Sequence, residues 1–174
     1  MTMNESEQNK QSTETVTSKE FRSKKKHRTF PGRFQNRSFG RLLTVQLLYQ
    51  EEMNPGSSDT FDEAFIFNED MPREKPLTAN DLTELKSFVQ RMFHGTRENI
   101  EVIDRQLENI AVHWSIQRMT PVDRNILRLA VYEMLYEQTP RAVAIHEAME
   151  IAKKLGTENS TAFINGILDK IVTE

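Results

Sequence analysis

The sequence contains no cysteine. Disulfide bonds, thiol catalysis and cysteine-ligated zinc or iron–sulfur sites are therefore excluded, and the composition is typical of a reducing compartment. There is no apolar run of about 18 residues, so no membrane-spanning helix is predicted, and the N-terminus has no hydrophobic signal core. These absences predict a soluble, cytoplasmic protein that has no membrane partner.

Recognisable catalytic patterns are also lacking. The six glycines are scattered singly and form no phosphate-binding loop. None of the four histidines pairs with a second histidine in a ligand pattern. His146 and Glu150 lie one turn apart on a predicted helix, but two ligands without a third do not make a metal site. Ser160 has no recognisable base. We predict no enzymatic activity, no cofactor and no metal.

The charge is distributed unevenly along the chain, although the net charge is only −3. Residues 1–18 carry −2, residues 19–41 carry +8, and the remainder carries −9. A basic segment attached to an acidic body is typical of an arm that binds a polyanion. Nucleic acid is therefore the first partner to consider.

Residues 1–36 are predicted to form a disordered basic N-terminal arm. Residues 1–20 are polar and have almost nothing to bury, and Pro31-Gly32 interrupts the basic stretch that follows. Phe21, Phe30 and Phe34 alternate with cations there, and RNA bases stack on such rings for about 1–3 kcal/mol each. A solvated tail that binds nothing is the alternative.

The rest of the chain has the apolar spacing of helices and nothing that reads as a strand, so we expect an all-α fold. The expected helices, six or seven in all, cover residues 37–52, 59–68, 79–113, 119–137, 141–155 and 160 onward. The long region 79–113 has a weak point at Gly95, where it is expected to bend.

The stretch 119–137 is predicted to be the central helix. Thr120 suits the N-cap and Pro121 suits the first helical position. Its apolar residues are too numerous for one stripe, so neighbouring helices should cover most of its circumference. Its polar residues are expected near its start or along one narrow side; these are Asp123, Arg124, Arg128 and Glu133.

Two stretches resemble the NusB family of bacterial antitermination factors. One is R-S-F-G-R-L-L-T-V-Q-L-L-Y-Q at residues 37–50. The other spans residues 113–171 and contains V-D-R-x-I-L-R-L-A-x-Y-E, E-A-x-E-x-A-K and F-x-N-G-x-L-D in that order. Residues 53–112 are similar only in helical character, and residues 1–32 are not similar. The resemblance implies two packed helical bundles within a domain at 37–174, divided into subdomains 37–113 and 114–174.

The resemblance also implies a function. Members of this family bind single-stranded boxA RNA of ribosomal RNA operon leaders, together with the ribosomal protein NusE, and join the RNA polymerase antitermination complex. By position, the implied RNA-binding residues are Arg33, Arg37, Arg41, Asn159, Phe163 and Lys170, and Asp123 lies on the face toward NusE. Spacing alone favours Phe163 as a core residue, and the resemblance reverses that preference. His146 stands where the family usually has asparagine.

Two other functions are considered. The chain could be a detached RNA-binding module for ribosomal RNA modification or processing, because domains of this fold also precede RNA methyltransferase domains. It could instead be a self-associating helical protein whose basic arm is incidental. The sequence leaves open whether the protein is a monomer or a homodimer.

Overall fold

The computed structural model describes residues 32–56, 77–110 and 115–171, which form six α-helices and one short 3₁₀ helix without a strand. The all-α prediction is confirmed. The helix expected at residues 59–68 and the arm at residues 1–31 lie outside the described residues. Within the described part of the chain, no helix is both long and apolar enough to cross a membrane.

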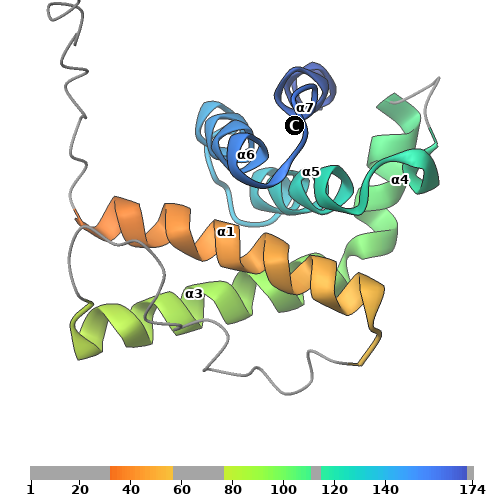
Figure 1. The fold of residues 1–174 in the computed structure, drawn as a ribbon. Helices are drawn as coiled ribbons and strands as arrows, with labels where there is room; N and C mark the ends of the chain where they lie inside the picture. The colour runs from red at the N-terminus through yellow and green to blue at the C-terminus, as the bar shows by residue number, and fades with distance from the viewer. Residues whose placement is uncertain (1–31, 57–76, 111–114, 172–174) are drawn as a thin grey trace, which may run out of the picture.

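The first layer consists of α1 (Gly32–Met53) and α3 (Ala79–Glu98), which lie side by side and run in the same direction (Figure 1). Asn36 at the start of α1 donates to Asp81 at the start of α3, and Arg97 near the end of α3 pairs with Glu51 near the end of α1. Because α1 already begins at Gly32, residues 32–36 belong to the helical body rather than to the arm.

The predicted long helix is divided at Asn99 into α3 and α4 (Ile100–Ile110). The side-chain amide of Asn99 donates to the Gly95 carbonyl at 2.8 Å, which closes the end of α3. Gly95 itself lies inside α3, where an added Cβ would be 2.0 Å from the Tyr132 hydroxyl oxygen. The glycine is therefore required by a close helix–helix approach, and the chain turns four residues later.

The central helix α5 (Pro121–Leu135) is preceded by the 3₁₀ helix η1 (Ile116–Arg118). Thr120 caps α5 as predicted, since its hydroxyl accepts the Asp123 backbone N–H at 3.1 Å. Every residue from Asp123 to Met134 is buried, including the four charged ones. This burial follows from the packing of α1, α3, α4, α6 (Arg141–Leu155) and α7 (Ser160–Leu168) around α5. The charged residues of α5 are thus covered by the neighbouring helices as well.

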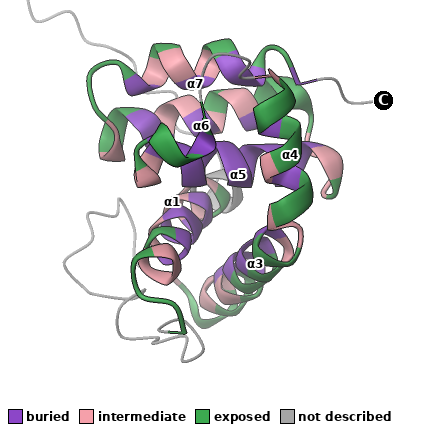
Figure 2. Cartoon of the chain, turned by 90° about the vertical axis from the view of Figure 1, so that its right-hand side faces the viewer, coloured by how far each residue is buried: buried purple, intermediate pink, exposed green. Residues whose placement is uncertain are grey.

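The second layer consists of α5, α6 and α7. Both views show α6 between α7 and α1 (Figures 1 and 2). One continuous apolar core joins the two layers, and its buried members include Phe93, Leu127 and Ile164. The subdomain boundary predicted at residue 113 falls outside the described residues and stays a prediction.

Candidate functional site

Arg37, on the second turn of α1, is exposed. Its guanidinium carbon lies 5.9 Å from the centroid of the Phe88 ring on α3, within the range of a cation–π contact. Arg91 approaches the same ring at 5.7 Å. A hollow of about 440 Å³ between α1 and α3 has Arg37, Phe88 and Arg91 among its lining residues. Arg91 is also paired with Glu137 at 3.1 Å, so part of its charge is neutralised.

Arg41, one turn further along α1, is buried and only 5 % exposed. Its guanidinium donates to both carboxylate oxygens of Glu133 at 2.8–3.0 Å and lies 3.8 Å from Glu147 on α6. Burial alone would lower the pKa of Arg41, but the hydrogen bonds and negative charges of Glu133 and Glu147 raise it above its ordinary value. This placement corrects the prediction that Arg41 lies on an RNA-facing surface. It joins α1 to α5 and α6.

Arg33 belongs to the first turn of α1, and its side chain lies outside the described part of the structure. Ser38 is the residue of these early turns that faces α6, because its hydroxyl donates to Glu147 at 2.8 Å. The start of α1 is thus fixed against α6 on one side and α3 on the other.

At the two ends of α7, Asn159 and Lys170 are exposed, and Phe163 within the helix is half-buried. Asn159 occupies the N-cap position, but its side chain makes no capping hydrogen bond and extends from the helix start. The Phe163 ring packs against the core with part of its surface accessible. Phe163 thus contributes to the core and keeps part of its surface accessible, and its RNA contact stays a prediction.

The structure does not bring all the predicted RNA-binding residues together. Phe163 lies on α7, and Asn159 and Lys170 lie just before and just after that helix. Arg37 lines the hollow between α1 and α3, and α6 lies between α1 and α7 (Figure 2). The described residues therefore contain two exposed regions rather than one continuous surface.

Asp123, the predicted partner-face residue, is 6 % exposed at the start of α5. Its position in the first turn suits the positive end of the helix dipole. Its Oδ1 atom is buried and has no hydrogen-bond partner in the structure. Only a small part of this residue is accessible, and its contact with NusE stays a prediction.

A buried charge network around α5 has no signature in the sequence. Glu52 at the end of α1 accepts from Asn125 at 2.8 Å and from Arg128 at 3.1 Å, and it pairs with Arg124. Arg128 also donates to Asp104 of α4 at 2.6 Å. Burial would raise the pKa of Glu52, but the bonds and charges of these partners lower it. The network joins α1, α4 and α5, and its function is structural.

Among the described residues, no group of three or more histidine, aspartate or glutamate side chains is arranged to hold a metal ion. His146 and Glu150 therefore remain two neighbouring surface residues of α6.

Comparison with known proteins finds relatives that all belong to one family. A model of the NusB family matches residues 40–173. The transcription antitermination protein NusB of Thermodesulfovibrio yellowstonii is 41% identical over 135 residues, covering 77% of this chain and 89% of that protein. NusB of Bdellovibrio bacteriovorus is 40% identical over 134 residues, covering 75% and 90%.

Solved structures give the same fold. NusB of T. maritima superposes with a TM-score of 0.58 at 38% identity, covering 77% of this chain and 88% of the other. A complex of the antitermination factors NusB and NusE with double-stranded RNA is similar in fold, with a TM-score of 0.59 at 23% identity and coverage of 78% and 94%.

Proposed function

The chain belongs to the NusB family of transcription antitermination factors, and from that premise we propose that it binds single-stranded boxA RNA of ribosomal RNA operon leaders together with the ribosomal protein NusE. Members of this family are not enzymes, which confirms the prediction of a non-catalytic protein. The chain would act as an adaptor that delivers RNA and a ribosomal protein to the antitermination complex of RNA polymerase.

The observation that carries the RNA part of the proposal is the outer face of α7. Asn159 presents an amide that can bond to base edges, Phe163 presents part of an aromatic ring, and Lys170 presents a cation for a phosphate. Unpaired RNA is recognised by this combination of stacking, base-edge hydrogen bonds and phosphate contacts. The helix is anchored to α5 and α6, so the three groups are held on a rigid support.

The basic segment 19–41 supplies the second component. Its cations would hold phosphates without reading the sequence, and Arg37 is its exposed member within the described side chains of α1. Arg41 contributes to RNA binding only indirectly. Its ion pair with Glu133 fixes the helix that presents Arg37, while its own guanidinium stays beneath the surface.

The partner part of the proposal concerns the start of α5. A buried carboxylate oxygen without a donor is uncommon, because buried polar atoms are normally hydrogen-bonded. Oδ1 of Asp123 is in this state. We infer that a hydrogen-bond donor of NusE bonds to this oxygen, after a small shift of the neighbouring residues makes the oxygen accessible to NusE. A solved relative contains NusB, NusE and RNA in one complex, which supports such an assembly.

Fluorescence anisotropy with a labelled single-stranded boxA RNA tests the proposal. Phe163→Ala should weaken binding by about tenfold, since a stacked base contributes about 1–3 kcal/mol. Lys170→Ala should weaken binding through the loss of a phosphate contact and should reduce the slope of log K against log salt by about 0.7. Glu108→Gln, an exposed change on α4, which packs against α5 and η1, is the control and should bind like the wild type. Wild-type affinity in both α7 variants, with circular dichroism unchanged, would refute the placement of RNA on α7.

A further inference from the structure

The two exposed regions of the proposed RNA interface leave a gap. Arg37 lies on the second turn of α1, and α6 lies between α1 and α7 (Figures 1 and 2). One RNA strand that contacts both must pass over α6. The properties of that helix's outer face therefore decide whether the crossing is favourable.

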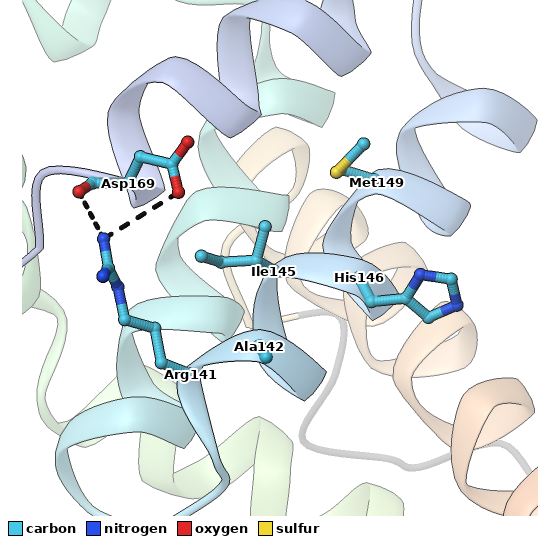
Figure 3. A pocket seen from close by; sticks show the side chains of 6 residues that line it. All are labelled: Arg141, Ala142, Ile145, His146, Met149 and Asp169. Atoms are coloured by element: carbon cyan, nitrogen blue, oxygen red, sulfur yellow. Dashed lines mark hydrogen bonds and ion pairs between the residues drawn. The ribbon is translucent and has the colours of Figure 1, made fainter.

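The outer face of α6 is hollowed where the strand would cross. A hollow of about 580 Å³ is lined by residues spaced along one side of α6, together with one residue from the end of α7: Arg141, Ala142, Ile145, His146, Met149 and Asp169. Figure 3 shows Arg141 and Asp169 at one side of this hollow and His146 extending away from them at the other. Ile145 and Met149 are half-buried between the two sides and form an apolar floor.

The acidic wall of the hollow is neutralised. Arg141 lies 3.9 Å from the Asp169 carboxylate and also donates to the backbone carbonyl oxygens of Leu168 and Asp169 at the end of α7. Asn165 donates to the same carboxylate at 2.9 Å. Both partners thus hold the Asp169 carboxylate. The apolar floor and the exposed His146 imidazole therefore face no unpaired carboxylate among the residues that line the hollow.

The charge of the surrounding chain also favours an anionic strand here. Residues 141–171 contain four Lys and Arg residues and four Asp and Glu residues, whereas residues 42–140 contain nine and seventeen. The acidic excess of the body thus lies outside α6 and α7. The Ser38–Glu147 hydrogen bond places the end of the basic segment directly beside α6. A polyanion bound at the start of α1 therefore meets, on the α6 side, a part of the body that has no acidic excess.

From this arrangement we propose that the hollow on α6 is a base-binding site of the RNA strand. One unpaired base stacks on the His146 imidazole and covers the floor formed by Ile145 and Met149, while the backbone continues from the start of α1 toward Lys170. Unpaired bases commonly stack on histidine and other planar side chains. This inference rests on the proposed function, because it assigns a further part of the same RNA path.

The test uses the full chain and a fluorescein-labelled single-stranded boxA RNA. His146→Ala and Met149→Ala should each reduce affinity by about tenfold, as expected for the loss of one stacked base. Val143→Ala removes another exposed apolar side chain of α6, 42% exposed and outside the hollow, and should stay within about twofold of the wild type. Since His146 is exposed, its replacement should leave the circular dichroism spectrum unchanged.

A second readout detects the contact directly. RNA carrying 4-thiouridine should crosslink on irradiation to the tryptic peptide 142–153, which contains both His146 and Met149. Wild-type affinity in both variants, with no adduct on this peptide, would overturn the inference while leaving RNA binding by the wild type intact. Loss of NusE affinity without loss of RNA affinity would also overturn it, because the hollow would then serve the protein partner. If the wild type binds no RNA, the proposed function itself fails.

Discussion

Replacing Arg41 by alanine should destabilise the protein far more than replacing its neighbour Arg37. The substitution removes all three hydrogen bonds between the guanidinium and the Glu133 carboxylate. Glu133 is 2 % exposed, so water cannot replace the missing donors. The Thr139 hydroxyl, at 3.2 Å, is the side-chain donor to Glu133 that remains among the described residues.

The magnitude follows from this burial. Breaking a buried ion pair by removing one partner costs about 3–5 kcal/mol, because an uncompensated charge stays in the interior. An exposed ion pair or cation contributes about 0–1 kcal/mol. Domains of this size have a total unfolding free energy of about 5–15 kcal/mol, so Arg41→Ala should remove a large share of it. Arg37→Ala should change it by less than about 1 kcal/mol.

Urea unfolding followed by circular dichroism measures both values. The double substitution Arg41→Met with Glu133→Leu provides the internal check, because replacing the whole pair by apolar side chains should recover most of the loss. The reasoning is refuted if Arg41→Ala lowers the unfolding free energy by less than about 1 kcal/mol. The pair would then behave like an exposed one, and Arg41 would be free to contact RNA.

Three further predictions follow from the packing and the charges. Gly95→Ala should destabilise the protein by about 1–3 kcal/mol, because the added Cβ would collide with Tyr132. Gly166→Ala should instead stabilise α7 by about 0.5–1 kcal/mol, because a Cβ at this position meets nothing within 4 Å. Urea unfolding measures both changes. Burial and the Glu137 carboxylate raise the pKa of Tyr132 to about 12. The neutral phenol is thus favoured in the folded state, so its contribution to the unfolding free energy is present below about pH 10 and lost toward pH 12. The wild type should therefore lose stability relative to Tyr132→Phe between these pH values. Parallel curves of unfolding free energy against pH for the two proteins would contradict this. Deleting residues 1–31 should flatten the plot of log K for RNA against log salt by about 0.7 for each phosphate that the arm binds in the wild type, and an unchanged slope would show that the arm binds none.

Helix capping and apolar spacing were sufficient to predict those helices whose limits depend on residues that are close in the sequence. Thr120 and Pro121 identified the start of α5, and the density of apolar residues after them correctly predicted a helix covered all round. The same rules could not separate Arg37 from Arg41, which lie one turn apart and look equivalent. The difference arises because Glu133, 92 residues further along, reaches Arg41.

The remaining errors also have long-range causes. Gly95 was predicted to be a point where the helix bends, but in the structure it lies against the Tyr132 ring of α5, which leaves no room for a Cβ. The partners of the charged residues of α5 were not predicted either, since Arg128 bonds to Glu52 and Asp104 on two different helices. Such pairings depend on the packing of α1 and α4 against α5, which spacing within one helix does not specify.

An RNA titration with boxA and with a scrambled sequence of equal length, each with and without NusE, tests whether this chain is an adaptor that recognises boxA RNA together with NusE. We expect tighter binding of boxA than of the scrambled strand, and a further gain for boxA when NusE is present. Equal affinity for both strands, with no effect of NusE, would contradict it.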